Sequence, residues 1–515
     1  MVRNGNLTIA AITSTLLILS GQAGAFGFDE VAAKAEALAG KEHQPPELVP
    51  EFLQNLGYEQ FQAIRFRPEA SLWRGGKSRF QVMMMPTGSF YRHPVKLNVV
   101  DREGVHPLSF DKTLFDYPST ELSKRVPADL GYAGFRLTYP MEEPGVQNQF
   151  LVFGGASYFR GVAAGQHFGL SARGVAVDTG LASGEEFPVF REFWLERPKG
   201  GSDSMLVYGL LDGPSLTGAY RFEVYPGKPL RLEVSARLFF REEVEQLGLA
   251  PLTSMFYYGE NTLRPRGQWR PQVHDSDGLL IHDQESGEWL WRPLLNPAEL
   301  ALGFHQVGNL GGFGLIQRDR DFLLFEDSEA RYDLRPSAWV EPGEEWGKGE
   351  VVLVEIPTDS ETNDNIVAFW KPRQQVAAGD SRYLTYTLYF GAPPISGHPL
   401  GQAVRTFVGD GAQPGGGKVE GAFRFIVDFK GGAMDKLDPD AAVVSEVSVN
   451  GNGEILEHFA EYIEARHGWR LSILAKPEEG RRLGLRGVLS ADGKPVSETW
   501  TYQLVPSSGL RRQPQ

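Results

Sequence analysis

The sequence predicts an all-β protein, and three observations support that class. Short runs that alternate apolar and polar residues recur from about residue 64 onward, among them VKLNVV, GFRLTYP and YRFEVYP. Sixty glycines and 34 prolines punctuate the 515 residues, so long helices are not expected. No helical pattern separates the successive runs, which favours antiparallel pairing over a parallel sheet with crossover helices. We therefore expect antiparallel β-sandwiches or barrels.

The chain is long enough for two or three domains. A stretch rich in proline and glycine, GAPPISGHPL at residues 391–400, looks like a linker. A new set of alternating strands follows it, including AFRFIVDF and GWRLSILA. We predict a large β-sandwich over residues 26–392, a linker over 393–401 and a small immunoglobulin-like β-sandwich over 402–510.

Only minor helices are expected, near the start of the chain. Residues 28–40 (FDEVAAKAEALAG) are rich in alanine, have apolar positions at helical spacing and end at Gly40. Residues 51–56 are expected to form one further helical turn.

Residues 1–25 have the pattern of a secretory signal peptide. Arg3 supplies the positive start, residues 7–19 the apolar region, and Ala23-Gly24-Ala25 the cleavage site. The apolar run is too short for a membrane anchor, and no second span follows it. No twin-arginine pair precedes it, which favours the general secretory route. We expect an exported protein whose mature chain begins near Phe26.

Charge and composition exclude several classes of function. The formal net charge of −14 argues against nucleic acid or an anionic membrane surface as a partner, and a neutral ligand fits better. Cysteine is absent, which excludes thiolate catalysis and disulfides. The ten histidines show no close pairing with metal-ligand spacing, and neither a phosphate-binding loop nor a dinucleotide fingerprint is present. We expect no metal and no cofactor.

Residues 351–372 (VVLVEIPTDSETNDNIVAFWKP) form the stretch around which the chain is organised. Two apolar runs with strand character flank a polar turn that carries Asp359, Glu361 and Asp364. Functional residues are often held on such loops between rigid strands. The alternative is an ordinary solvated hairpin, because turns favour Asp, Asn and Thr on their own.

Several further stretches place aromatic rings beside charged side chains. This combination suits a sugar, because pyranose faces pack on rings while planar polar groups bind hydroxyls. For any single tryptophan the alternative is core packing. We expect one cleft in the large domain that gathers the stretches around Ser157, Arg173, Glu186, Asp275, Trp291, Arg320, Arg335 and Asp364.

Hydrolysis of a glycosidic bond needs two carboxyl groups, one to protonate the leaving oxygen and one to activate water. The candidates are Asp275 and Asp364, since each lies in a predicted loop. Glu361 is three residues from Asp364, and a like charge there favours the protonated acid. The alternative for Asp275 is a turn residue in HDSDG, and Asp277 is less attractive because it directly precedes Gly278.

The chain resembles the periplasmic glucan biosynthesis proteins G and D over nearly its whole mature length. The motifs that carry the resemblance are GASYFRG (155–161), GLSARGVAVDT (169–179), SGEEFP (183–188), APLTSMF (250–256), HDSDGL (274–279), GFGLIQRDRDF (312–322), YDLRPSAWVEP (332–342), EWGKG (345–349) and EIPTDSETNDNIVAFW (355–370). The resemblance implies a large domain of the galactose-mutarotase type, a small immunoglobulin-like domain and a periplasmic location. The lack of a twin-arginine signal favours the G type.

The resemblance also implies an activity, inverting endo-β-1,2-glucanase, with assigned residues. Asp364 of the ETNDNIV motif would be the general acid, and Asp275 of the HDSDG motif the general base. Glu361 and Tyr332 would line the subsites. The implied substrate is β-1,2-glucan, and a membrane glucosyltransferase would be the pathway partner.

Three interpretations remain open from the sequence. The first is a hydrolase that trims or releases nascent β-1,2-glucan. The second is a non-catalytic protein that binds glucan and serves as a scaffold beside the membrane glucosyltransferase. The third is a lectin-like or structural β-protein. Paired loop carboxylates beside aromatic residues favour the first over the third.

Overall fold

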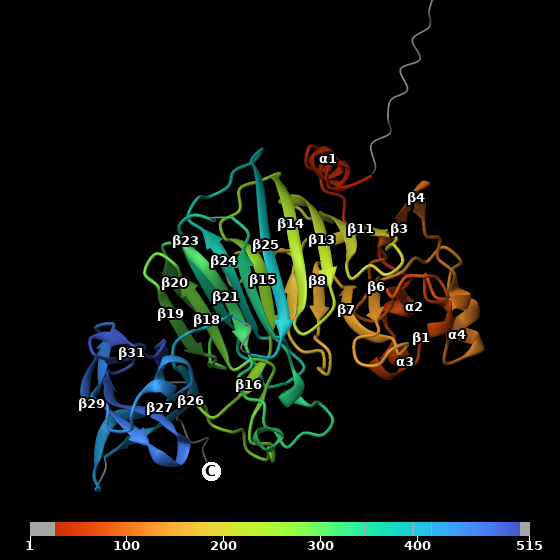
Figure 1. Ribbon diagram of the computed structural model, residues 1–515. Helices are drawn as coiled ribbons and strands as arrows, with labels where there is room; N and C mark the ends of the chain where they lie inside the picture. Colours follow the sequence, from red (N-terminus) through yellow and green to blue (C-terminus); the bar gives the residue numbers. More distant parts are fainter. Residues whose placement is uncertain (1–25, 345, 394–395, 414, 505–515) are drawn as a thin grey trace, which may run out of the picture.

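The computed structural model describes residues 26–344, 346–393, 396–413 and 415–504. Two large β-sheets face each other, and a smaller group of strands adjoins them at one end (Figure 1). The all-β prediction is confirmed, since strands dominate and the helices are few and short. The predicted signal peptide, residues 1–25, lies outside the described residues.

The first large sheet has ten strands and is antiparallel throughout. Its strands lie in the order β2 (Gln81–Met85), β6 (Gly134–Tyr139), β7 (Asn148–Gly154), β8 (Tyr158–Gly161), β9 (Ser171–Arg173), β15 (Leu247–Ser254), β24 (Ile366–Pro372), β23 (Gly349–Glu355) and β20 (Ala301–Val307), with β10 (Val175–Val177) paired to β15.

The second large sheet has fifteen strands and extends into the end of the chain. Its order is β28 (Val443–Val449), β31 (Leu483–Ala491), β33 (Thr499–Leu504), β19 (Glu288–Pro293), β18 (Gly278–Asp283), β21 (Leu310–Ile316), β22 (Ser337–Pro342), β25 (Ser381–Gly391), β14 (Leu230–Phe240), β13 (Leu216–Tyr225), β12 (Met205–Asp212), β11 (Val189–Glu196), β3 (Lys96–Asp101) and β4 (Gly104–Pro107), with β32 (Lys494–Pro495) beside β31.

The inner faces of the two large sheets form one hydrophobic core. It joins aromatic residues of the first sheet, such as Phe135, Phe153 and Phe159, to Phe193 and Phe222 of the second. Ring centroids there lie 5.1–5.4 Å apart, from Phe135–Phe193 to Phe153–Phe193. Because each buried aromatic side chain contributes on the order of 2–3 kcal/mol, this core holds the sandwich together.

The C-terminal lobe, residues 402–504, is a second, smaller sandwich. A four-stranded sheet of β26 (Gln402–Ala412), β27 (Lys418–Lys430), β30 (Gly468–Pro477) and β29 (Gly453–Ile463) packs against β28, β31 and β33. The lobe does not have a separate core, because Trp289, Trp291 and Trp339 of the large sandwich belong to the same cluster as Trp500. Strand β33 also pairs in parallel with β19 through Leu290↔Thr499 and Trp291↔Trp500.

The remaining elements are short. Two small sheets pair β1 (Arg65–Phe66) with β5 (Phe115–Asp116) and β16 (Phe256–Tyr258) with β17 (Val273–His274). The helices after the first are α2 (Glu51–Gln54), α3 (Tyr58–Gln62) and α4 (Thr120–Arg125). The single turns of 3₁₀ helix are η1 (Pro68–Ala70), η2 (Lys112–Leu114), η3 (Phe322–Leu324), η4 (Tyr332–Leu334), η5 (Gly432–Lys436) and η6 (Glu464–Arg466).

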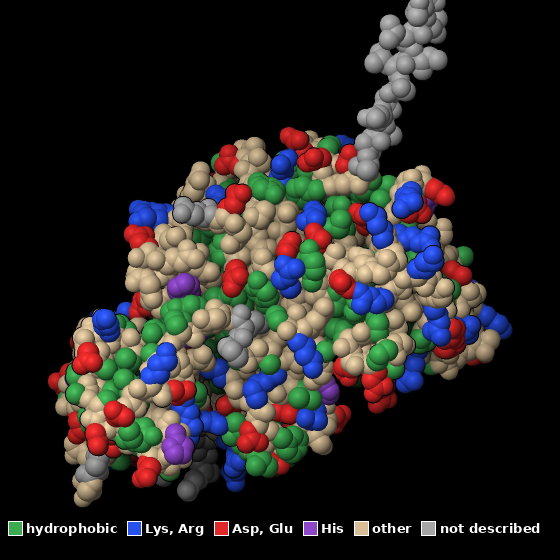
Figure 2. Space-filling view, in the orientation of Figure 1, with side chains coloured by type: hydrophobic (Ala, Val, Ile, Leu, Met, Phe, Trp, Pro, Cys, Tyr) green, Lys and Arg blue, Asp and Glu red, His purple; other side chains and the backbone are tan. Residues whose placement is uncertain are grey.

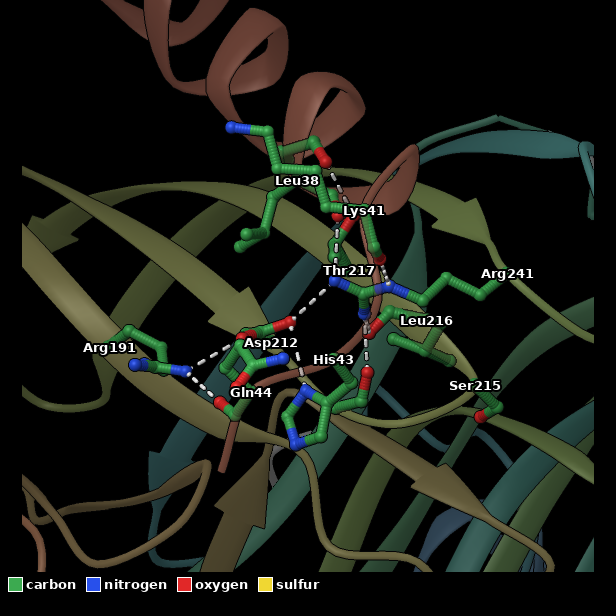
Figure 3. A network of polar contacts seen from close by, with 12 residues as sticks. Leu38, Lys41, His43, Gln44, Arg191, Asp212, Ser215, Leu216, Thr217 and Arg241 are labelled. Atoms are coloured by element: carbon green, nitrogen blue, oxygen red, sulfur yellow. Dashed lines mark hydrogen bonds and ion pairs between the residues drawn. The ribbon is translucent and has the colours of Figure 1, made fainter. Parts of the chain in front are cut away.

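The predicted N-terminal helix forms as α1 (Phe28–Ala39) and ends at Gly40. Its buried residues Val31, Ala32 and Ala35 cover the outer face of the second sheet. Backbone carbonyls at its end accept hydrogen bonds from Arg241, which donates to Leu38 and Lys41 over 2.8 and 2.9 Å (Figure 3). A polar network therefore fixes the end of α1 to the sheet.

Asp212 is the centre of that network, which we call the Asp212 clamp (Figure 3). Its side chain is 1% exposed and contacts Arg191 at 2.9 Å, Arg241 at 3.0 Å and His43 at 3.5 Å. Arg191 also donates to the carbonyl of Gln44 over 2.7 Å. Two guanidinium groups thus neutralise one buried carboxylate and tie residues 38–44 to the sheet.

The hairpin predicted at residues 351–372 forms as β23 and β24, with ladder pairs from Gly349↔Pro372 to Glu355↔Ile366. Both strands are buried on both faces. Val351 and Leu353 face the main core, while Val352 and Val354 join a second cluster with Phe369. Burial of both faces explains why the sequence shows a continuous apolar run instead of alternation.

The surface carries charges of both signs. On the face in Figure 2, acidic and basic side chains are interspersed, and neither sign dominates a broad area. Within the residues that the structure describes, no helix is both long and apolar enough to cross a membrane.

Candidate functional site

Two loops bring Asp364 and Asp275 together, and both are fixed to the segment at Met255 and Phe256. Asp364 lies at the end of the β23–β24 loop, where the side chain of Asn365 pairs with the backbone of Phe256 through bonds of 2.8 and 3.0 Å. Asp275 follows β17, and its amide donates to the carbonyl of Met255 over 2.8 Å. The charge of Asp364 reaches far enough to raise the pKa of Asp275.

Asp275 is a buried carboxylate whose side chain has few hydrogen bonds and ion pairs. Its side chain is 11% exposed, and its Oδ1 lies 3.5 Å from Nε of Arg335, too far for a good hydrogen bond. Burial raises the pKa of Asp275 to about 6, against the opposing effect of Arg335. Such a group is able to exchange a proton near neutral pH.

Asp364 is more open, with a side chain that is 31% exposed. Its Oδ2 lies 3.3 Å from the guanidinium of Arg160 on β8. Arg160 is held in turn by Ser171, which accepts a bond of 2.7 Å from its Nε. Partial burial raises the pKa of Asp364, while the nearby Arg160 and Arg335 lower it. The site thus holds a second carboxyl group, open to solvent and with a raised pKa.

Glu361 lies in the same loop as Asp364 and fastens it to two other segments. Its Oε2 accepts from the hydroxyl of Tyr332 over 3.0 Å and pairs with Arg270 at 2.6 Å. Arg270 also contacts Asp327 at 2.8 Å. The guanidinium of Arg335 lies 5.3 Å from the centre of the Tyr332 ring. These contacts fix Tyr332 and Arg335 beside the two carboxylates.

Arg173 reaches the site from β9. Its guanidinium is 2% exposed, pairs with Glu185 and lies about 5 Å from the rings of Tyr158 and Phe187. The pKa of the Tyr158 phenol is raised, chiefly by burial and further by the charges of Glu185 and Asp364, which places this group on the Asp364 side. The ring of Phe187 is 49% exposed.

Four of the predicted residues lie away from the carboxylates or behind them. Glu186 accepts from the amide of Ser215 at 3.1 Å, in the turn between β12 and β13. Trp291 is 3% exposed and lies in the core shared with the C-terminal lobe. Arg320 donates to the carbonyl of Arg335, so it supports that residue from behind. Ser157 is buried, and its carbonyl accepts from the amide of Gly174 at 3.0 Å.

Four residues that the structure places in the site were not predicted from the sequence. These are Arg160, Ser171, Arg270 and Glu185. Glu185 directly precedes Glu186, and neighbouring residues in extended backbone point in opposite directions, so the motif alone does not tell which one faces the site. Arg160 lies within the motif GASYFRG, where a charged residue beside two aromatic rings was the available signal.

No cluster of His, Asp or Glu that could hold a metal ion is found in residues 26–344, 346–393, 396–413 and 415–504. A hollow of about 970 Å³ lies elsewhere, between the ends of β20, β23 and β24, and it contains neither carboxylate. The groups that the structure shows at the site are two carboxyl groups with arginine and tyrosine side chains around them.

Comparison with known proteins identifies the family. Residues 26–504 match the family model described as "Periplasmic glucan biosynthesis protein, MdoG". The chain is 44% identical over 505 residues to glucans biosynthesis protein G of Pseudomonas paraeruginosa (strain DSM 24068 / PA7), with 96% of each chain covered. It is also 44% identical over 497 residues to the protein of the same name in Ralstonia nicotianae, covering 95% of this chain and 98% of that one.

Among solved structures, the crystal structure of an α-galactosidase from Lactobacillus brevis aligns with 50% of this chain and 38% of its own. The TM-score of 0.25 and the 8% identity are too low to carry any argument. The sequence relationships, in contrast, extend over nearly all of the described residues. The chain belongs to the family of periplasmic glucan biosynthesis proteins.

Proposed function

We propose that the protein is an inverting endo-β-1,2-glucanase that cleaves the glucan backbone in the periplasm. The observation that carries the proposal is the pair formed by Asp275 and Asp364. Both lie on loops fixed to the same segment, and both have a raised pKa. Glycoside hydrolases commonly use two carboxyl groups whose pKa values are shifted by their surroundings.

Asp364 acts as the general acid in this proposal. Its carboxyl group gives its proton to the glycosidic oxygen as the bond between that oxygen and the anomeric carbon breaks. The 31% exposure of the side chain leaves room for the leaving sugar to reach it. After the reaction the carboxylate is paired with Arg160 until it takes up a proton from solvent.

Asp275 acts as the general base. A water molecule attacks the anomeric carbon from the opposite face, and its proton passes to Asp275 directly or through hydroxyl groups and further waters. The Oδ1 of Asp275 is buried and has no hydrogen-bond partner among the described residues, so it is available to accept. The water oxygen ends on the sugar with inverted configuration.

Substrate binding is assigned to the polar and aromatic side chains around the pair. Glu361, Tyr332 and Arg335 are held close to the carboxylates, and Arg173 extends the site toward Phe187. Phe187 is 49% exposed, and Trp269, which directly precedes Arg270 in the chain, is 66% exposed; such rings suit the apolar face of a pyranose. Trp291 and Glu186 have structural contacts that leave them out of this role.

One contact favours a second function. The Arg160 guanidinium 3.3 Å from Asp364 lowers the pKa of that carboxyl, which opposes the protonated form that a general acid needs. A site in which Asp364 stays ionised binds glucan hydroxyls without cleaving the chain. The protein then serves as a glucan-binding scaffold for the membrane glucosyltransferase that makes the backbone.

Incubation of the purified mature protein with linear β-1,2-glucan separates the two functions. The hydrolase proposal expects shorter glucans by size-resolved product analysis, and linear β-1,3-glucan serves as the control for linkage. Binding of β-1,2-glucan is measured in parallel by calorimetry. Binding without any shortening of the chains would support the scaffold function and contradict the hydrolase.

A further inference from the structure

A buried run of polar contacts crosses from the C-terminal lobe to the loop that carries Asp275. It begins at Arg405 on β26, close to β16 (Figure 1). Nη1 of Arg405 contacts Oε2 of Glu260 at 2.7 Å and Oδ2 of Asp319 at 3.2 Å. Both acidic residues belong to the large sandwich, so one arginine of the C-terminal lobe pairs with two carboxylates of the large sandwich.

The run continues from Asp319 to both sides of Asp275. Oδ2 of Asp319 accepts a bond of 2.8 Å from Gln272, whose side-chain oxygen lies 3.1 Å from Nε2 of His274. The amide of Asp319 donates to Oδ2 of Asp277 over 3.2 Å. The residues directly before and two positions after Asp275 are therefore both connected to Asp319.

Burial makes the charge of Arg405 important to this arrangement. Asp319 and His274 are buried, at 7% and 0% exposed, and Glu260 and Asp277 are partly buried. Burial raises the pKa of Glu260 to about 7 and raises the pKa of Asp319, whereas Arg405 lowers both. Removal of one partner from such a pair leaves an uncompensated charge, which forces the surrounding groups to rearrange.

The lobes remain joined without Arg405. Glu498 accepts two bonds of 2.6 and 2.9 Å from Arg318, and Arg486 pairs with Glu288 at another point of the boundary. The ladder between β19 and β33 also crosses there. A cavity of about 30 Å³ lies beside Glu260, Asp277, Asp319 and Arg405, and it gives the loop room to shift if the contact with Arg405 is lost.

We propose that Arg405 is a positioning residue for the Asp275 loop, through which the C-terminal lobe sets the geometry of the hydrolytic site. The inference rests on the proposed hydrolase function for its kinetic consequence, while the structural link itself does not depend on activity. The C-terminal lobe is then a working part of the site and not an independent module.

The kinetic test uses Arg405→Gln and two arginine controls. Arg486→Gln removes another contact between the lobes, and Arg424→Gln removes a buried arginine that pairs with Glu457 and Ser472 inside the C-terminal lobe. A displaced catalytic group costs about 10²-fold in rate, so Arg405→Gln is expected to lower kcat by about that factor on β-1,2-glucan. The KM of Arg405→Gln is expected to stay within about twofold of wild type, and so is the kcat of both controls.

A double variant protects the test against a simple loss of folding. In Arg405→Gln with Asp319→Asn, one uncompensated carboxylate is removed together with the arginine, so the loop regains part of its order and kcat recovers at least severalfold over Arg405→Gln. If kcat stays at the single-variant value while thermal unfolding returns to the wild-type temperature, Arg405 acts on stability alone and the proposal is wrong.

Hydrogen–deuterium exchange supplies a readout that does not depend on hydrolysis. Amides of residues 272–278 are expected to exchange faster in Arg405→Gln than in wild type or in either control, with the strands β27 and β30 unchanged. Faster exchange across the whole C-terminal lobe, or no change at residues 272–278, would overturn the proposal. If wild type does not cleave β-1,2-glucan, the hydrolase function fails, and the exchange data still decide the role of Arg405.

Discussion

The Asp212 clamp and the Asp275–Asp364 pair place carboxylates in contrasting environments. Asp212 is 1% exposed and has two arginines within 3.0 Å, together with His43 (Figure 3). Asp275 is 11% exposed, and the guanidinium of Arg335 lies 3.5 Å from its Oδ1. Among the described residues Oδ1 of both carboxylates lacks a well-formed hydrogen bond, so the two differ in the number and closeness of their ion pairs. A carboxylate that serves the fold is neutralised on several sides, whereas a carboxylate that is to move a proton is left incompletely paired.

The contrast has an energetic meaning. Pairing at Asp212 stabilises the attachment of residues 38–44 to the second sheet. Incomplete pairing at Asp275 costs stability whenever the group is ionised, because burial raises its pKa to about 6. We therefore expect substitutions at Asp275 and Asp364 to lower activity, and a substitution at Asp212 to lower stability while activity is kept.

The largest expected effect is on the rate. Asp364→Asn and Asp275→Asn keep the shape of each side chain and remove its proton chemistry, so each should lower kcat on β-1,2-glucan by roughly 10²–10⁴-fold. Glucan binding, measured by calorimetry, should survive. The matched control is Asp203→Asn, since this side chain is 82% exposed and lies outside the site. A near wild-type rate in either site variant removes that residue from its assigned role.

The second effect is on stability. Asp212→Asn leaves Arg191 and Arg241 without their buried countercharge, which typically costs about 3–5 kcal/mol in the free energy of unfolding. We expect this loss in denaturant unfolding, with kcat on β-1,2-glucan within about twofold of wild type for the folded fraction. Asp203→Asn removes only an exposed ion pair with Arg79, so it should change stability by less than about 1 kcal/mol. Equal stability of both variants would refute the role given to the clamp.

The third effect is a dependence of stability on pH. The folded pKa of Asp275, about 6, lies above the ordinary value of 3.8 for an aspartate, so the native state binds one more proton than the unfolded chain between about pH 4 and 6. Stability due to this group is therefore present at low pH and falls as the pH rises through that window. Because one pKa unit corresponds to about 1.4 kcal/mol, Asp275→Asn should gain up to about 3 kcal/mol over wild type between pH 4 and 7.

Unfolding in urea at a series of pH values measures this gain. The difference in the free energy of unfolding between Asp275→Asn and wild type should grow from pH 4 to pH 6.5 and then level off. Asp203→Asn is again the control. A difference that stays constant over the whole range would show that the carboxyl of Asp275 does not have a raised pKa in the folded protein.

The smallest expected effect is that of metal removal. The reaction proposed here uses two carboxyl groups and water, and the described part of the chain contains no cluster of metal-ligating side chains. Exhaustive dialysis against EDTA should therefore leave kcat unchanged. Loss of activity that one divalent ion restores would contradict the two-carboxylate mechanism.

Much of the fold could be predicted from local pattern. The helix at residues 28–39 and the hairpin of β23 and β24 were both predicted, because spacing and turn residues specify them directly. The contact between the lobes was not predicted, because the alternation of residues along a strand does not tell which other strand it pairs with. The pairing of Trp291 with Trp500 links residues far apart in sequence. The division at residues 393–401 stays a prediction.

The candidate site could be predicted only in part. Asp275 and Asp364 were predicted because polar loops between apolar strands can be recognised in a sequence. Trp291 has the same aromatic and charged neighbours as a sugar-binding residue, but tertiary packing buries it. Glu185 and Glu186 differ only in the direction of their side chains, which depends on how the segment pairs with its neighbours.

The stereochemistry of hydrolysis tests the central claim most directly. Wild-type protein is mixed with linear β-1,2-glucan, and the anomeric signals of the new reducing ends are followed by ¹H NMR before mutarotation equilibrates them. Inverting hydrolysis by Asp364 and Asp275 predicts that the α-anomer appears first and then relaxes to the equilibrium mixture. First appearance of the β-anomer, or no new reducing ends while the glucan is bound, would contradict the account.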